Sequence, residues 1–167
     1  MGSLDPPVGW SNMIVAVLTS MATNHGSQPK WPKWIEEMAR QLEVKLKLPN
    51  QFFNSCNGNR YQGSKENLEY HSDDESMFRK SEFERDVFIA SISFGATRNF
   101  SILEKYGRTL DPIGLEDGDL LTMSGRMQDD YKHAILQDKF PDPSIRFNLT
   151  FRAILRHDTK CIQRQPF

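Results

Sequence analysis

The sequence predicts a mainly β fold with one flanking helix, and three observations lead to that prediction. Only residues 29–48 show the three-and-four spacing of apolar side chains that marks an amphipathic helix. After residue 51, short runs rich in β-branched and aromatic residues alternate with glycine, asparagine and aspartate, as strands alternate with turns. The length of 167 residues, with 38% hydrophobic and 26% charged content, suits one globular domain. We therefore expect one helix packed on a many-stranded antiparallel sandwich or barrel.

The helix is expected between Pro32 and Pro49. Proline suits the first turn of a helix, and it pushes the residue before it out of helical geometry. The apolar face of this helix consists of Ile35, Met38, Leu42 and Leu46. We expect that face to pack on the sheet.

Six strands are expected from the β-rich runs. They lie at residues 52–62, 87–94, 99–103, 119–123, 132–136 and 146–155. The turn signals are Asn57-Gly58, Gly95-Ala96, Gly107-Arg108 and Asp117-Gly118. Residues 65–86 hold eight acidic and four basic side chains, so we expect a solvated loop with short helical turns there.

Charge and cysteine content limit the functional classes. Lysine plus arginine number 21 and aspartate plus glutamate 22, so the net charge of -1 provides no global positive field for a polyanion. Cys56 and Cys161 are the only cysteines, which excludes a disulfide framework and suits a reducing compartment. The apolar run at 13–18 is far shorter than the ~20 residues of a membrane span. We expect an intracellular protein, cytoplasmic or nuclear, without membrane contact, and a buried thiol at Cys56.

A candidate metal site begins at His71 and Asp73. On an extended backbone these two side chains project to the same face, because side chains alternate with period two. His133, in a strand-like segment, is the natural third ligand. Two imidazoles and one carboxylate form the facial triad of non-haem Fe(II) oxygenases. The spacing also arises by chance, so an ordinary loop histidine beside acidic neighbours remains the alternative.

A second candidate site lies on the last expected strand. One face of residues 146–152 carries Arg146, Asn148, Thr150 and Arg152, and the other face carries phenylalanine and leucine. Two arginines with an amide between them can clamp a small dicarboxylate. On the first expected strand, Asn59 and Tyr61 share a face in the same way. The alternative is a half-exposed strand with a solvated polar face.

Taken in chain order, these residues resemble the AlkB-type Fe(II)/2-oxoglutarate dioxygenases. The resemblance extends from residue 54 to residue 155 and includes Asn59-Arg60-Tyr61, His71-Ser72-Asp73, Ser91-Ile92-Ser93-Phe94-Gly95-Ala96, Gly118-Asp119-Leu120-Leu121, His133 and Arg146-Phe147-Asn148-Leu149-Thr150-Phe151-Arg152. It implies a double-stranded β-helix, or jelly roll, within a single domain at 1–167. Residues 1–50 would be a short N-terminal extension with the helix and a reduced lid, 51–156 the core and 157–167 a tail.

The resemblance also implies the cofactors and a role for each site residue. Fe(II) would be held by His71, Asp73 and His133. The distal carboxylate of 2-oxoglutarate would pair with Arg146, helped by Tyr61. The carboxylate end that chelates iron would be steadied by Arg152 and Asn59, with Asn148 completing the pocket. Dioxygen would be the second co-substrate.

The implied reaction is oxidative removal of N-alkyl groups from nucleobases, with release of formaldehyde, succinate and carbon dioxide. Asp74 and Glu75 directly follow the aspartate ligand and are interpreted as contacts to the alkylated base, although they equally suit a solvated acidic run. We expect a monomer whose partner is alkylated, single-stranded DNA or RNA. Two alternatives stay open: the same chemistry on a protein side chain or small metabolite, and a non-catalytic binding module with this fold.

Overall fold

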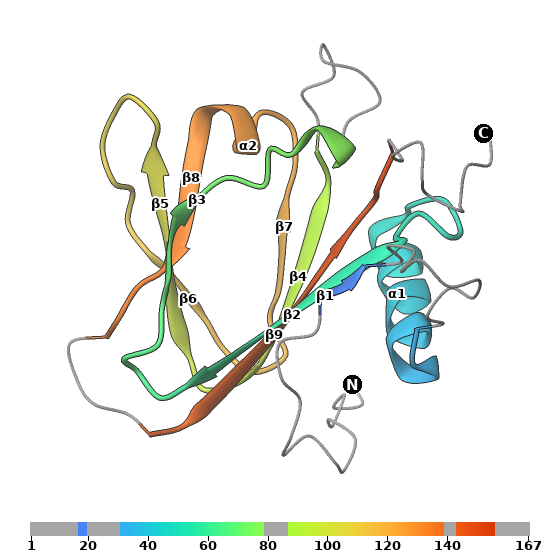
Figure 1. The fold of residues 1–167 in the computed structure, drawn as a ribbon, viewed down its shortest axis with the longest axis horizontal. Coiled ribbons are helices and arrows are strands. Elements are labelled where there is room, and N and C mark those ends of the chain that lie inside the picture. The colour runs from blue at the N-terminus through green and yellow to red at the C-terminus, as the bar shows by residue number, and fades with distance from the viewer. Residues whose placement is uncertain (1–16, 20–30, 79–86, 139–142, 156–167) are drawn as a thin grey trace, which may run out of the picture.

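The computed structural model describes residues 17–19, 31–78, 87–138 and 143–155, which form two antiparallel sheets and one long helix (Figure 1). In chain order the elements are β1 Val17–Thr19, α1 Lys33–Leu46, β2 Ser55–Gln62, β3 Leu68–His71, a 3-10 helix Ser76–Phe78, β4 Ile89–Gly95, β5 Arg98–Glu104, β6 Ile113–Leu115, β7 Leu120–Met123, α2 Met127–Asp130, β8 Tyr131–Ile135 and β9 Ile145–Arg152. The mainly β fold with a flanking helix is therefore confirmed, and two facing antiparallel sheets are the framework of a jelly roll.

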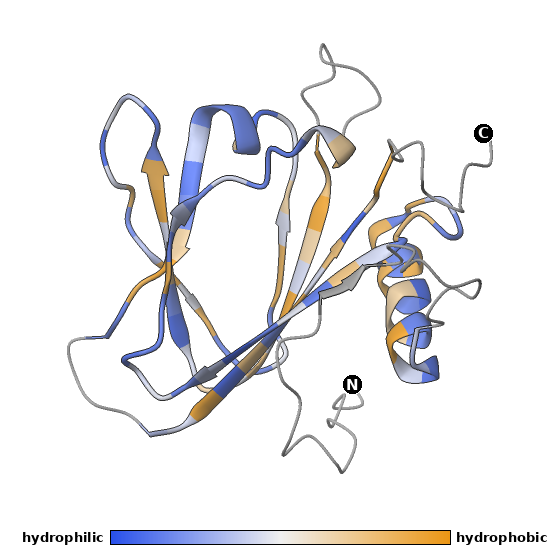
Figure 2. Cartoon of the chain, in the orientation of Figure 1, coloured by the Kyte–Doolittle hydropathy of each residue, from blue (hydrophilic) through white to orange (hydrophobic). Residues whose placement is uncertain are grey.

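The larger sheet has the strand order β1-β2-β9-β4-β7, and α1 covers its outer face (Figure 1). Ile35, Ala39 and Leu42 of α1 pack against Leu149 and Phe151 of β9, and all of these side chains are buried. Figure 2 shows β4 as mostly hydrophobic, which agrees with a central strand covered on both faces. This layer is the main hydrophobic core.

The smaller sheet has the strand order β3-β8-β5-β6 and faces the larger one. A second buried cluster, which includes Tyr61, Ile89, Phe100, Met123 and Ile135, draws its members from both sheets. The space between the sheets is therefore packed at its base. Polar side chains line the remainder, which is described below.

Helix α1 has the limits that its prolines predicted. The carbonyl oxygen of Pro32 accepts the N–H groups of Ile35 and Glu36, and Lys47 ends the helix in a left-handed conformation with φ of 56°. Glu43 is a buried carboxylate on this helix, 2% exposed. Its oxygens accept the backbone N–H groups of Gln51 and Phe53 at 3.0 and 2.9 Å. The helix is thus fastened to the chain that enters β2.

All six predicted strands are present, with small differences at their ends, and Cys56 is fully buried as expected. The Asn57-Gly58 turn is wrong, because both residues lie inside β2 opposite Thr150 and Leu149. Strands β3 and β6 were not predicted, and residues 65–78 are not only a loop. Strand β3 has only four residues, of which two are exposed and two half-buried, so its strand conformation comes from pairing with β8 rather than from intrinsic propensity.

The apolar run at 13–18 lies mostly outside the described residues, as do Cys161 and residues 79–86. Its last two residues belong to β1, where Val17 and Leu18 are opposite Asn57 and Cys56 of β2. Among the described residues, no helix combines the length and apolar character needed to cross a bilayer.

The connection between β4 and β5 joins the two sheets through Gly95. Its φ of 80° lies in the left-handed region. A Cβ at this position would overlap the backbone carbonyl oxygen of Ile145, so the turn requires glycine for two separate reasons. Gly118 has a similar φ of 82°, but a Cβ there would meet open space.

Candidate metal centre and co-substrate pocket

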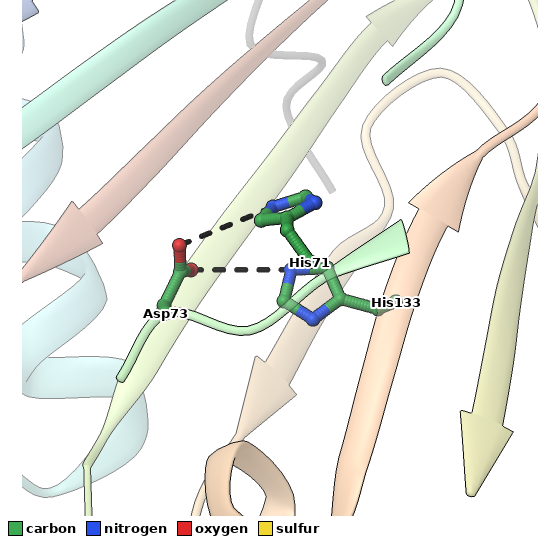
Figure 3. Close-up of side chains that lie close together, drawn as sticks. All are labelled: His71, Asp73 and His133. Carbon is green, nitrogen blue, oxygen red and sulfur yellow. Dashed lines mark ion pairs between the residues drawn. The ribbon is translucent and has the colours of Figure 1, made fainter. Parts of the chain in front are cut away.

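Three potential metal ligands converge at the edge of the smaller sheet (Figure 3). His71 is the last residue of β3 and lies opposite His133 of β8, while Asp73 follows just after β3. The Nε2 atoms of His71 and His133 lie 4.0 and 3.9 Å from the two carboxylate oxygens of Asp73. One potential ligand atom from each residue lies within 4.8 Å of the others. The structure therefore brings together the three residues that the sequence pattern selected.

Local hydrogen bonds hold the segment that follows β3. The register of β3 with β8 shifts between Leu68 and His71, as in a β-bulge. The Ser72 hydroxyl donates to the Tyr131 carbonyl at 2.8 Å. The buried Gln128 side-chain oxygen accepts the backbone N–H of Asp73 at 2.9 Å. These contacts direct the Asp73 side chain towards the two imidazoles.

Both imidazoles are suited to bind a cation through Nε2. Nδ1 of His71 lies 2.8 Å from the Glu69 carbonyl oxygen, so Nδ1 carries the proton and Nε2 keeps its lone pair. His133 is buried and stacks on Phe100. Burial, followed by the proximity of His71, lowers the pKa of His133 to about 4, against the opposing effect of Asp73. His133 is therefore neutral near pH 7, as a metal ligand must be.

Asp73 is already paired in this structure. Nη2 of Arg152 donates to its Oδ2 at 2.8 Å, and the Asp73 carboxylate is 5% exposed. The resemblance places Arg152 at the carboxylate end of 2-oxoglutarate that chelates iron. In this structure Arg152 pairs instead with the carboxylate of Asp73, the proposed metal ligand. Two imidazoles and one carboxylate fit Fe(II), because this donor set leaves coordination positions open.

Arg146 is the deepest cation of the pocket, 2% exposed. Its Nη2 donates to the Ser93 hydroxyl at 2.9 Å, and its guanidinium carbon lies 5.4 Å from the centre of the Tyr61 ring. Its Nε and Nη1 are buried, and no hydrogen-bond partner for them lies in the part of the chain that the structure describes. Leaving such donors unpaired costs about 1–3 kcal/mol or more. A bound carboxylate would provide a charged acceptor for one of these donors.

The polar side chains between Arg146 and the three ligands form a continuous wall. Asn59 donates to the Asn148 side-chain oxygen at 2.8 Å, and Asn148 donates to Ser91 and Thr150 at 2.5 and 3.0 Å. These side chains line one cavity of about 250 Å³. The polar lining of the cavity consists of Asn57, Asn59, Tyr61, His71, Asp73, Glu75, Ser91, His133, Arg146, Asn148, Thr150 and Arg152. One cavity thus combines a metal-binding triad with a site for an anion.

The two acidic residues after Asp73 lie at the surface. The Asp74 side chain is 53% exposed, and its carboxylate lies 3.6 Å from Lys105 Nζ. Glu75 is exposed and lines the cavity. Both are near the metal triad, and only Glu75 contributes to the cavity lining.

Sequence reasoning missed several residues that shape the pocket. Ser91 and Ser93 are alternate residues of an otherwise apolar strand, which is a period-two signal that could have placed them on the pocket face. Gln128 and Arg98 gave no such signal, because their partners are 55 and 32 to 38 residues away in the chain.

Comparison with known proteins gives relatives that include AlkB homologues. The chain is 32% identical over 136 residues to human alpha-ketoglutarate-dependent dioxygenase alkB homolog 3, which covers 75% of this chain and 44% of the human protein. It is 31% identical over 131 residues to DNA oxidative demethylase ALKBH2 of Arabidopsis thaliana, covering 65% and 40%. The chain thus spans less than half the length of these curated relatives.

Solved structures agree on the fold. OsALKBH1 superposes with a TM-score of 0.57 at 20% identity, covering 75% of this chain and 67% of that one. An oxidoreductase of the 2OG-Fe(II) oxygenase family from Burkholderia pseudomallei superposes with a TM-score of 0.54 at 14% identity, covering 86% and 68%. The model of the 2OG-Fe(II) oxygenase superfamily matches residues 7–152. The chain therefore belongs to the 2OG-Fe(II) oxygenase superfamily as an AlkB-like member, which confirms the resemblance and implies Fe(II) and 2-oxoglutarate at the cavity.

Proposed function

We propose that the chain is an Fe(II)- and 2-oxoglutarate-dependent dioxygenase that removes N-linked methyl groups from nucleobases of single-stranded DNA or RNA. The observation that carries the proposal is the content of one cavity: a His-Asp-His cluster, and a buried arginine with two unpaired donors. A metal triad alone would suit many oxygenases. The added anion site supports a dicarboxylate co-substrate bound next to the metal.

His71, Asp73 and His133 are the proposed ligands of Fe(II). The iron, with 2-oxoglutarate and dioxygen, would supply the oxidation that hydroxylates an N-methyl carbon, after which the carbon leaves as formaldehyde. Gln128 and Ser72 hold the ligand segment in place through the bonds described above. The chain itself provides no proton transfer step in this scheme, and its task is to bind and orient.

The proposed 2-oxoglutarate residues divide between the two ends of that molecule. Arg146 binds the distal carboxylate through its guanidinium, whose buried Nε and Nη1 have no hydrogen-bond partner among the described residues, and the Tyr61 ring lies beside it. Arg152, Asn59 and Asn148 lie on the path towards the metal and are proposed to orient the other end. Because most of these groups are largely buried, their electrostatic effect on the co-substrate is stronger than it would be in water.

Asp74 and Glu75 are the proposed contacts to the substrate base. A carboxylate can accept a hydrogen bond from an exocyclic amine or stabilise a cationic methylated base. Their positions directly after Asp73, exposed and near the metal triad, support this role. The choice of a nucleobase substrate is supported by the matched relative that is a DNA oxidative demethylase.

The test is product mass after incubation of methylated oligonucleotides with the chain, iron, ascorbate and 2-oxoglutarate. Single-stranded DNA, single-stranded RNA and duplex DNA are compared in parallel. We expect loss of one methyl group together with formaldehyde release, and faster turnover of the single-stranded forms.

The same assay decides between the alternatives. Turnover of 2-oxoglutarate with an unchanged oligonucleotide would indicate that the substrate of the oxygenase is a protein side chain or a small metabolite. If iron binding is unmeasurable and a His71→Ala variant binds its partner as well as the parent does, the chain is a non-catalytic module.

A further inference from the structure

Arg98 is a second buried cation, at the first residue of β5, and the site described above gives it no role. It is 3% exposed. Along β5, Ile102 lies opposite His133, and Arg98 precedes Ile102 by four residues. Since a strand rises about 3.3 Å per residue, Arg98 lies well away from the metal triad. It is at the Arg146 end of the cavity, as its contact with Tyr61 shows.

The polar contacts of Arg98 reach three separate segments. Its guanidinium donates to the carbonyl oxygens of Gly63 and Glu66, in the connection from β2 to β3, at 3.2 and 2.9 Å. It also donates to the Leu136 carbonyl at 2.5 Å, just after β8. Its Nε lies 2.6 Å from Oδ2 of Asp138. A buried charge needs such partners, so Arg98 is held firmly and has little capacity left for a ligand.

Arg98 and Arg146 share the ring of Tyr61. Their guanidinium carbons lie 5.8 and 5.4 Å from the ring centre, within the range of cation–π contacts. Tyr61 and Arg146 are also direct neighbours across β2 and β9. The two arginines differ in their polar partners. Both terminal nitrogens of Arg98 donate to backbone carbonyls, and its Nε, which makes no hydrogen bond, lies 2.6 Å from the Asp138 carboxylate. The buried Nε and Nη1 of Arg146 have no hydrogen-bond partner among the described residues.

Two cations beside one ring also repel each other. Burial lowers the pKa of Arg146, the Tyr61 hydroxyl opposes that change, and the charge of Arg98 lowers it further. An anion bound to Arg146 would offset this repulsion, because it places a negative charge beside the Arg146 guanidinium. The pair therefore favours a ligand with a carboxylate at this end of the cavity.

We infer that Arg98 is a positioning residue for the distal carboxylate of 2-oxoglutarate, acting through the Tyr61 ring on the guanidinium of Arg146. The inference rests on the proposed function. Arg98 holds the Tyr61 ring in place, and the ring in turn positions the Arg146 guanidinium, which contacts the ligand. Arg98 itself does not touch the co-substrate.

The test measures binding rather than turnover, with the full chain loaded with Zn(II), which does not undergo redox change. Calorimetry gives the Kd of 2-oxoglutarate and of 2-oxopentanoate, which has the same carbon skeleton but a methyl group in place of the distal carboxylate. For Arg98→Lys we expect roughly tenfold weaker binding of 2-oxoglutarate, because a displaced Arg146 guanidinium would lose about one charged hydrogen bond to the distal carboxylate. The Kd of 2-oxopentanoate should change less than about twofold, since this ligand has no distal carboxylate to pair with Arg146.

A matched variant controls for loss of an arginine elsewhere. Arg126 is an exposed arginine that pairs with Asp130, so Arg126→Lys should leave both Kd values unchanged. If Arg98→Lys does not fold, Asp138→Asn takes its place. This variant keeps the Arg98 guanidinium but removes its carboxylate partner, and the loss of 2-oxoglutarate affinity should be smaller and still selective.

The outcomes separate this inference from the proposed function. An equal rise in the Kd of both ligands would mean that Arg98 acts only through general packing, and this would overturn the inference. An unchanged Kd for 2-oxoglutarate would also overturn it. Either result leaves the proposed function intact if the parent binds 2-oxoglutarate. A parent that binds no 2-oxoglutarate would overturn both.

Discussion

The two sheets of this protein differ in regularity, and the difference follows what each sheet holds. In the larger sheet, β9 pairs without interruption along β2 and along β4, and α1 covers the outer face. In the smaller sheet, β3 pairs with β8 only at Leu68 and His71, with a shift in register between them. The regular sheet carries Arg146 and Arg152, whereas the irregular edge carries His71.

The two sheets thus have different roles: the larger one positions co-substrate residues, and the edge of the smaller one positions metal ligands. Continuous ladders and a buried apolar layer fix the position of the co-substrate residues on β9. A metal triad needs a local departure from regular pairing, because two imidazoles and a carboxylate must meet at one point. Mutations in the two sheets should therefore damage different properties, stability in one and metal chemistry in the other.

The largest expected effect is loss of metal chemistry from the smaller sheet. Asp73→Ala removes the carboxylate of the triad, so iron-dependent decarboxylation of 2-oxoglutarate should be abolished. The midpoint of urea unfolding should change far less than activity does. Asp111→Ala, at an exposed aspartate, is the matched control and should retain full activity. Retained decarboxylation in Asp73→Ala would contradict the assignment of Asp73 as a metal ligand.

The second effect belongs to the larger sheet. Phe151 is fully buried on β9, with its ring centre 5.8 Å from that of Phe53 and 6.2 Å from that of Trp31. Phe151→Ala should lower the free energy of unfolding by about 3–5 kcal/mol, as for other large-to-small changes in a core. Val44→Ala, at a side chain that is 80% exposed, should change it by less than about 0.5 kcal/mol. Urea denaturation checks both, and similar values for the two variants would contradict the described core.

A smaller effect is expected from Gln128, which supports the triad without belonging to it. Gln128→Leu keeps similar volume but removes the acceptor of the Asp73 backbone N–H. Metal affinity should fall about tenfold or more, the range found when groups that orient ligands are removed. Competition with a chelator for Co(II) measures this. Gln137→Leu, at an exposed glutamine, should leave the affinity unchanged.

The smallest expected effect is the dependence of stability on pH in the metal-free protein. Burial lowers the pKa of His133 to about 4, from the ordinary histidine value of 6.5. Between these values the unfolded chain binds a proton that the folded chain does not. The contribution of His133 to stability is therefore complete above pH 6.5 and is lost as pH falls towards 4.

Urea midpoints at pH 7 and pH 5 check this dependence, with His133→Asn as the comparison. The parent should lose more stability on acidification than the variant does. Parallel losses in the two proteins would show that His133 is not the group responsible.

Much of this architecture could be predicted from the sequence, because it follows from local periodicity. The limits of α1 come from Pro32 and Pro49, and the shared face of Arg146 and Arg152 comes from the alternation of side chains along a strand. The joint position of the proposed metal ligands followed from the same alternation, extended by the resemblance. These features need only residues close in sequence or a known motif.

The features that escaped prediction depend on contacts between distant segments. Strand β3 is short and has no buried residue, and its pairing with β8 makes it a strand. Asn57 has a turn-like residue type, yet it lies in an interior strand because two neighbouring strands satisfy its backbone. Gln128 and Arg98 owe their roles to partners far along the chain. No local pattern contains that information.

The turn at Gly95 has a consequence for how far sequences with this fold can diverge. Any side chain at Gly95 would collide with the Ile145 carbonyl, in the residue next to Arg146, so substitution there would disturb the link between the sheets and the co-substrate arginine together. Gly118 has only its positive φ to protect it, and asparagine or aspartate can adopt that backbone conformation. In a library of random substitutions, Gly118 should therefore accept a few residue types, whereas Gly95 should accept none.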